Sequence, residues 1–472
     1  MTAQLTTHRE VSSARLTGLG TVVLLAGPFL ANLDFFITNI ALPAIQRELH
    51  AGTAALELIV AGYGTAYAVL LVAGGRWGDD FGRRRLFTIG VAAFTVTSLA
   101  AGLAPNTATL LTARILQGAS AALMTPQALA TFHAALEGRA RHRAVGLYAA
   151  AGGLAAVVGQ LLGGVLVTAG GAAGGWRLIF LINVPVGVAA LLLLRRTVPS
   201  TRAPQRAGVD ARGTVLLALA IAALLVPLTE GPVLGWPWWS WVCLAAVPLL
   251  VMALVRTSRH AERAGRMPLL PPSVLAVRSL RRGLPVMVGF FAVFGVFMFA
   301  FAISVQTGLH VTAWEAALAI TPVCVAYFLT SFVVPALLRR FDRNVLTAGL
   351  VLESLGLAAL LVIVATSWPR MDLLLAIGAL VLVGIGQALC VGSLFRLVLS
   401  EVPVQAAGVG SGILVTAQQT AMAIGVAGLG SVFTSVATGL SMLAAVIVIV
   451  AVQLGITVAL VVASRLLPRI SA

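Results

Sequence analysis

Fourteen long apolar runs, separated by short polar loops, constrain this chain more than any other feature. They lie near residues 17–41, 55–75, 85–104, 108–131, 143–168, 177–194, 212–230, 238–256, 283–306, 313–337, 344–365, 372–396, 406–433 and 442–464. A helix needs about 20 mostly apolar residues to cross a bilayer. With 60% hydrophobic and 10% charged residues, the 472-residue chain is far too apolar for a water-soluble protein. The sequence predicts an all-α, multi-pass membrane protein with fourteen transmembrane helices.

The positive charges indicate how the chain is oriented. All 31 basic residues are arginines, and 27 of them fall on one side of the fourteen runs. The other side holds only Arg47, Arg177 and Arg370, and Arg114 lies inside a run. Cytoplasmic loops are enriched in basic residues, so both termini are expected in the cytoplasm. This distribution explains the net charge of +16 by membrane topology and not by nucleic-acid binding, and the lysine-free composition indicates a bacterial cytoplasmic membrane.

Two similar loops predict an internal repeat. Residues 75–86 and 335–346 agree at Phe81 and Phe341, Arg83 and Arg343, and Leu86 and Leu346. Each loop follows the second run of a block of six, and the fifth run of each block is rich in glycine. We therefore expect a six-helix bundle over 1–200, a linker with two inserted helices over 201–260, and a second six-helix bundle over 261–472.

Four short motifs carry a family resemblance. The loop at 75–86 has the pattern of a gate motif, G-x-L-x-D-R-x-G-R-R, although Asp80 stands where an arginine is usual. A second motif spans 33–43 with Asp34, Asn39 and Pro43 in place, and a third spans 110–118. The fourth, in the fifth run, comprises Gly146, Gly159, Gly163 and Gly164, with Gln160 in place of a proline. The chain resembles the major facilitator superfamily, and within it the fourteen-helix drug:proton antiporters.

The resemblance implies roles for several of these residues. The cytoplasmic gate that latches the two halves would comprise Gly75, Asp79, Gly82, Arg83, Arg84, Arg340 and Arg343. The glycines of the fifth run, with Gln160 among them, would form the antiporter motif that distinguishes export from import. The string 176–187 is similar to the stretch that enters the sixth helix of the fourteen-helix exporters. A monomer is the expected state.

Three ionisable residues within the runs are candidates for proton coupling. Asp34 lies deep in the first run, where an ionised carboxylate is costly, so it can load a proton or act as a permanent partner of Arg114. Arg114 is expected to face the cavity, as a relay or as a structural partner. Glu353 is either a further proton or cation site or a protonated structural acid. Glu57 and Glu230 lie near helix ends, and we expect them to reach the membrane interface.

Polar and aromatic side chains within the runs are candidates for the substrate cavity. They are Asn39, Tyr63, Tyr67, Gln117, Phe290, Phe294, Gln306 and Gln418. Phe290 and Phe294 belong to a stripe of four phenylalanines on one face of the ninth run, which could bind a lipophilic cation or simply pack against helices and lipid.

These features predict proton-coupled efflux of lipophilic drugs or antibiotics by an alternating-access antiporter. The expected partners are a small lipophilic or cationic substrate, protons and the lipid bilayer. The sequence carries no phosphate-binding loop, metal-ligand cluster or nucleophile triad, so we expect no cofactor and no enzymatic activity. Two alternatives stay open: a proton-coupled importer on the same fold, and a membrane sensor or enzyme.

Overall fold

The computed structural model describes residues 16–171, 174–201, 210–232, 234–266, 268–370, 374–403 and 407–467. Within these ranges the regular structure is helical, and thirteen helices are long and apolar enough to cross a membrane. Arg9, Arg15, Arg202, Arg206 and Arg469, which contribute to the expected orientation, lie outside the described residues. The prediction of an all-α, multi-pass membrane protein is confirmed.

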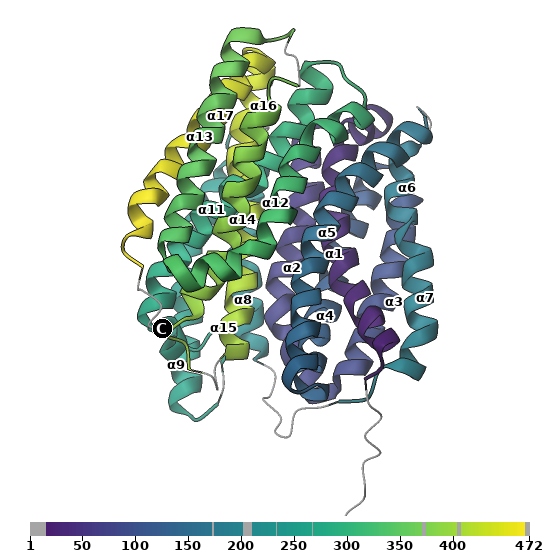
Figure 1. The fold of residues 1–472 in the computed structure, drawn as a ribbon, viewed down its shortest axis with the longest axis vertical. Helices are drawn as coiled ribbons and strands as arrows, with labels where there is room; N and C mark the ends of the chain where they lie inside the picture. The colour runs from purple at the N-terminus through teal and green to yellow at the C-terminus, as the bar shows by residue number, and fades with distance from the viewer. Residues whose placement is uncertain are drawn as a thin grey trace, which may run out of the picture.

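The first half of the chain forms one bundle, drawn in purple and blue in Figure 1. Its helices are α1 (Gly18–Leu49), α2 (Thr53–Phe81), α3 (Arg83–Gly102), α4 (Thr107–Ala135), α5 (Gly138–Ala169), α6 (Gly175–Leu181) and α7 (Asn183–Thr197). The 29-residue α4 is not among the thirteen apolar helices, because polar residues such as Arg114 and Gln117 interrupt it. It nevertheless packs along α2 and α3 inside the bundle, and so supplies the fourteenth expected span.

The second half forms a matching bundle, drawn in green and yellow in Figure 1. Its elements are α10 (Pro272–Leu275), α11 (Arg278–Ile303), η1 (Ser304–Gly308), α12 (Ala313–Phe341), α13 (Asn344–Ser367), α14 (Ile377–Leu399), α15 (Ala407–Ile424), η3 (Gly425–Gly430), α16 (Ser431–Gly439) and α17 (Met442–Ser464). The inserted pair, α8 (Ala211–Glu230) and α9 (Trp238–Arg263), lies between the bundles in sequence, and α8 packs against α2, α15 and η3.

Two of the expected helices are not regular along their whole length. The sixth run divides at Ile182 into α6 and α7, because Pro185 cannot donate a hydrogen bond to the carbonyl of Leu181 and its ring crowds that carbonyl. The thirteenth run passes through a π-helical turn, η3, between α15 and α16. Another π-helical turn, η1, ends α11 and carries Gln306. Such turns are often found at functional positions in helices.

The two bundles meet along a seam formed by helix pairs α5 and α12, α2 and α15, and α1 and α11. Glycines allow the closest approaches. A Cβ atom on Gly164 of α5 would lie 2.5 Å from the Cβ of Ala317 on α12. Within the second bundle, a Cβ on Gly425 would likewise lie 2.1 Å from the carbonyl oxygen of Ala292 on α11. These glycines let backbone meet backbone, as small residues do at helix interfaces in membranes.

Candidate functional site

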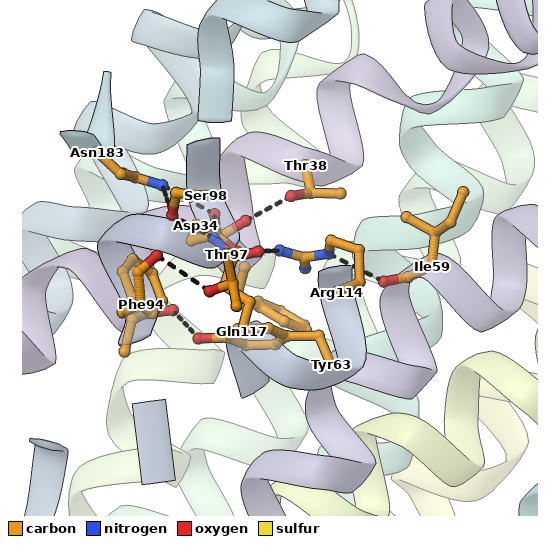
Figure 2. Close-up of polar contacts among 12 residues, drawn as sticks. Asp34, Thr38, Ile59, Tyr63, Phe94, Thr97, Ser98, Arg114, Gln117 and Asn183 are labelled. Carbon is orange, nitrogen blue, oxygen red and sulfur yellow. Dashed lines mark hydrogen bonds and ion pairs between the residues drawn. The ribbon is translucent and has the colours of Figure 1, made fainter. Parts of the chain in front are cut away.

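A buried polar cluster surrounds Asp34 in the centre of the first bundle (Figure 2). Arg114 on α4 forms an ion pair with the Asp34 carboxylate, and both side chains have 0% exposure. Gln117 Nε2 donates to Asp34 Oδ1 at 2.8 Å, and Asn183 Nδ2 donates to the same oxygen at 3.0 Å. Ser98 joins the cluster, because its Oγ lies 2.8 Å from Gln117 Nε2. Four helices, α1, α3, α4 and α7, therefore contribute to one hydrogen-bonded site.

The atoms that face Asp34 describe its charge state. The guanidinium of Arg114 and the amide nitrogens of Gln117 and Asn183 can only donate hydrogen bonds. A carboxylate without a proton accepts all three, and burial of such a charge is tolerated only when it is paired and hydrogen-bonded. The three donors therefore match an Asp34 carboxylate that carries no proton.

Arg114 is itself held on several sides. Its Nε donates to the carbonyl oxygen of Ile59 on α2 at 3.2 Å. Its guanidinium carbon lies 4.4 Å from the centre of the Tyr63 ring and 5.5 Å from that of Phe180, a cation–π arrangement. Tyr63 is fixed in turn by its hydroxyl, which donates to the carbonyl of Ala31 at 2.8 Å. Arg114 Nη2 has no hydrogen-bond partner among the described residues.

Asp34 points away from the seam between the bundles. Its partners all belong to the first bundle, whereas Phe36, two residues later on α1, lies at the seam. The ring of Phe36 is 6.4 Å from that of Phe294 on α11. Residues two positions apart on a helix point about 200° apart around its axis. α1 therefore directs Asp34 into the first bundle and Phe36 toward the seam, and so connects the Asp34 cluster with the seam.

The antiporter motif of α5 divides between two neighbours. A Cβ on Gly159 would lie 3.1 Å from the carbonyl oxygen of Leu33, and a Cβ on Gly163 would lie 3.0 Å from the side chain of Ile37, both on α1. Gly164 approaches α12 instead. Gly146 does not share this role, because nothing lies within 4 Å of its Cβ position among the described residues. Gly146 therefore takes no part in the close contacts that Gly159, Gly163 and Gly164 make.

Gln160 lies on the same helix at the seam. It is buried, and its Nε2 lies 3.8 Å from the sulfur of Met298 on α11. Its Oε1 has no hydrogen-bond partner among the described residues. The polar amide that replaces the family's usual proline thus faces the opposite bundle.

The gate residues at the junction of α2 and α3 form contacts within the first bundle. Arg83 donates to Asp79 Oδ1 from Nη2 at 2.7 Å and to the carbonyl of Ala130 on α4 at 3.1 Å. Gly82, between α2 and α3, has a φ of +103°, which favours glycine. A Cβ on Gly75 would lie 3.7 Å from the Cβ of Pro126, an ordinary contact distance. The family role of this loop, a latch between the two halves, stays a prediction.

An arginine clasp recurs in both bundles. Arg84 donates to the carbonyl of Val198, just beyond α7, at 3.2 Å. Arg343 donates to the carbonyls of Arg465 and Leu467, just beyond α17, at 3.1 and 3.0 Å. Each arginine follows the second helix of its bundle and binds the end of the sixth, although Arg84 stands one position after Arg83, the residue that the predicted repeat aligns with Arg343. Arg340 lies instead over the ring of Phe341, 5.3 Å from its centre.

Glu353 lies in the second bundle, apart from the Asp34 cluster of the first bundle. It is buried on α13, beside Gln387 of α14, and its Oε2 has no hydrogen-bond partner among the described residues. The helices that pack against α13 are α12, α14 and α17, all in the second bundle. The structure does not bring Glu353 together with Asp34 and Arg114.

The remaining cavity candidates separate into three groups. Gln117 and Tyr63 belong to the Asp34 cluster, and Tyr67 packs beside Tyr63 with ring centres 6.1 Å apart. Gln306 reaches across the seam, where its Nε2 donates to the carbonyl of Ile40 at 2.9 Å. Asn39 donates to the carbonyl of Phe35 within α1, Phe290 packs 6.4 Å from Phe294, and Gln418 is half-buried on α15.

Sequence reasoning missed several residues of the site. Asn183 lies in the string 176–187, which resembles the family, but the sequence indicated no role for it. Ser98 is only one of several small polar residues in an apolar run. Gly74 and Gly78, one turn apart on α2, approach α4 at Ala122 and Gln127, which the shared helical face could have indicated. Glu57 was expected at the membrane interface, and this was wrong, because it is 1% exposed.

Two helical bundles with a buried acid and arginine inside the first are the arrangement typical of membrane transporters. The chain belongs to the Major Facilitator Superfamily, whose family model matches residues 24–426. This is a family of transporters, and the fold prediction is confirmed. The chain is similar to a POT family transporter solved with 5-aminolevulinic acid, with a TM-score of 0.72 and 14% identity over 96% of this chain and 98% of that one. A similarity at that identity shows the fold alone.

Sequence relatives extend over most of the chain. The "Probable actinorhodin transporter" of Streptomyces coelicolor is 34% identical over 87% of this chain and 71% of its own length. The "Puromycin resistance protein pur8" of Streptomyces alboniger is 33% identical over 88% and 81%. The "Tetracenomycin C resistance and export protein" of Streptomyces glaucescens is 32% identical over 91% and 78%. The resemblance to drug exporters of this superfamily is confirmed.

Proposed function

We propose that this protein exports a lipophilic antibiotic-like compound from the bacterial cytoplasm in exchange for protons, as a monomer with both termini in the cytoplasm. The observation that carries the proposal is the buried ion pair of Asp34 and Arg114, held by amide donors and facing no solvent. The names of two relatives, a resistance protein and a resistance and export protein, support the direction and the substrate class.

The arrangement supports an indirect coupling between proton and substrate. A proton on Asp34 removes the charge that pairs with Arg114, so α1 is held less tightly against α4. The same helix presents Phe36 to the seam, beside Phe294 and near Gln160. A change in how α1 is seated therefore alters the apolar surface on which a lipophilic substrate would bind. Protonation from outside would release the substrate and allow the return step, which is driven by the proton gradient.

Accumulation of a fluorescent lipophilic cation such as ethidium, together with puromycin susceptibility, tests this proposal in a bacterium that lacks its own efflux pumps. The wild type should lower accumulation, and both a protonophore and Asp34→Asn should abolish the effect. Glu48→Gln is the matched control, because Glu48 pairs with Arg177 at 2.9 Å in a partly exposed site at the opposite end of α1 from the arginine-rich loops. Higher accumulation with the wild type would indicate import instead. Export that persists in Asp34→Asn would remove Asp34 from the coupling.

A further inference from the structure

A second buried acid ties the two bundles together at the outer end of the seam, the end opposite the arginine-rich loops. Glu57 lies one turn into α2 and is 1% exposed. Its Oε2 is 2.6 Å from the hydroxyl of Ser431, and its Oε1 is 2.9 Å from that of Thr434. Both hydroxyls belong to α16 in the second bundle. The contact therefore exists only while the outer ends of α2 and α16 are together.

The hydroxyl of Ser431 is surrounded by more hydrogen-bond acceptors than it can donate to. It carries a single hydrogen, yet its Oγ also lies 3.0 Å from the carbonyl oxygen of Leu228 on α8 and within hydrogen-bonding reach of that of Ala427. Carbonyl oxygens cannot donate. The Leu228 carbonyl also lacks its usual helical partner, because the residue four positions later is Pro232, which has no N–H. A donor from outside the helix is needed there, and Ser431 is placed to supply it.

If Ser431 donates to Leu228, the hydrogen in its 2.6 Å contact with Glu57 must come from Glu57. A single chain of bonds then satisfies every group: Thr434 donates to Glu57 Oε1, the Glu57 carboxylic acid donates to Ser431, and Ser431 donates to Leu228. An ionised Glu57 would leave the Leu228 carbonyl without this donor and would bury a charge without a cation.

The charged surroundings of Glu57 agree with a neutral acid. Glu230, at the end of α8, faces it as a like charge. The segments η3 and α16 carry no charged residue along Gly425–Gly439. Arg114 on α4 contacts α2 at the Ile59 carbonyl and the Tyr63 ring, and its Nη1 is bound to Asp34 and Gln117.

We infer that Glu57 is a second proton-binding site, distinct from Asp34, and that the outer side of the transporter closes only when this site holds a proton. Opening separates Glu57 from the hydroxyls of α16 and exposes it to the outer medium, where it can lose the proton. Closing takes a proton up from the same side. The role in the transport cycle rests on the proposed export function, whereas the protonation of the closed state does not.

The opening can be measured without transport by electron spin resonance distances between labels at Leu103→Cys and Leu440→Cys. Leu103 follows α3 in the first bundle and Leu440 follows α16 in the second, with 63% and 78% exposure. Cys243, which is half-exposed, is replaced by serine, and the purified protein is studied in lipid nanodiscs. We expect the longer, open distance to gain population as pH rises in the wild type.

Glu57→Gln should remain closed at every pH, because the amide can accept from Thr434 and donate to Ser431 as the protonated acid does. Glu57→Ala, which removes the bonds, should open without pH dependence. Glu315→Gln is the matched control, since Glu315 is an exposed acid that caps its own helix at the outer end of α12, and it should titrate like the wild type. Infrared spectroscopy should show a protonated carboxyl stretch in the closed protein that Glu57→Gln lacks.

A wild-type distance that does not change with pH, or the same titration in Glu57→Gln, overturns the inference. These outcomes are separable from failure of the proposed function. If no compound is exported but the distances follow Glu57, the proton site stands and the export proposal falls. If export depends on Asp34 but the label distances do not change in the Glu57 variants, the export proposal stands and the inference about Glu57 falls.

Discussion

Breaking the Asp34–Arg114 pair from one side should cost far more stability than breaking a pair that water can reach. In Asp34→Asn, Arg114 keeps the Ile59 carbonyl and the Gln117 amide oxygen, 3.2 and 2.7 Å away, but loses its counter-charge in a site with 0% exposure. Arginine cannot give up its proton. Removal of one partner of a buried pair costs roughly 3–5 kcal/mol, and we expect Asp34→Asn to lower the free energy of unfolding by that amount.

The reverse variant should cost less. In Arg114→Met, Asp34 keeps the amide donors of Gln117 and Asn183, and the freed carboxyl can take up a proton instead of remaining charged. In the double variant Asp34→Asn/Arg114→Met neither charge remains, so most of the loss should be recovered. Replacement of a buried pair by apolar residues is often neutral or stabilising. The coupling energy between the two positions should therefore be large and favourable.

Denaturant unfolding of the purified protein in detergent, followed by tryptophan fluorescence, measures these free energies. The control is Glu48→Gln, whose partner Arg177 is 27% exposed, and a partly exposed pair of this kind contributes about 0–1 kcal/mol. If Asp34→Asn costs no more than Glu48→Gln, or if the double variant is no more stable than Asp34→Asn, Asp34 and Arg114 are not a charged pair in the folded protein and the reasoning about the proton site is refuted.

Three further predictions follow from the packing. Gly164→Leu should stop the outer side from closing and abolish export, because even the Cβ of the new side chain would lie 2.5 Å from the Cβ of Ala317 on α12. Gly146→Leu is the control and should export normally. Thiol accessibility at the outer end reports the difference. Glu353→Gln should leave export unchanged and should not lower the melting temperature, since the Glu353 carboxyl lies inside the second bundle beside the side-chain amide of Gln387. A melting curve and an ethidium assay check both. Arg343→Ala should destabilise the protein by about 1–2 kcal/mol, because two hydrogen bonds to the end of α17 are lost. Arg340→Ala should not, because Arg340 lies over the ring of its neighbour Phe341. Denaturant unfolding compares the two variants.

The fold could be predicted from the sequence because bilayer thickness leaves few solutions for long apolar runs. The run lengths indicated the helices, and the repeat of the loop at 75–86 in 335–346 indicated two bundles. The pairing of Asp34 with Arg114 was also foreseen as one alternative, since two opposite charges in apolar runs have few other partners. The break at Ile182 was missed, although Pro185 stands in the sequence, because a proline near a helix end does not by itself say that the run divides.

The missing part of the site depended on long-range placement. Nothing in α2 alone distinguishes a Glu57 that reaches the membrane surface from one that is sealed against α16, because Ser431 and Thr434 are more than 370 positions away. The direction of Asp34 was also beyond pattern reasoning. An acid and a phenylalanine two positions apart fit a helix in either orientation, and only the neighbours of α1 decide which one faces the seam.

The arginine clasps of Arg84 and Arg343 have a mechanical consequence. Each joins the beginning of its bundle's third helix to the end of the sixth, and thereby closes that bundle into a ring at its arginine-rich end. A ring of this kind resists internal shear, so thermal fluctuations concentrate on the joint between the two halves. A movement of one half against the other then breaks only contacts between the bundles, such as those of Gln306 and Gln160, and substitutions there would change the rate of that movement without disturbing either half.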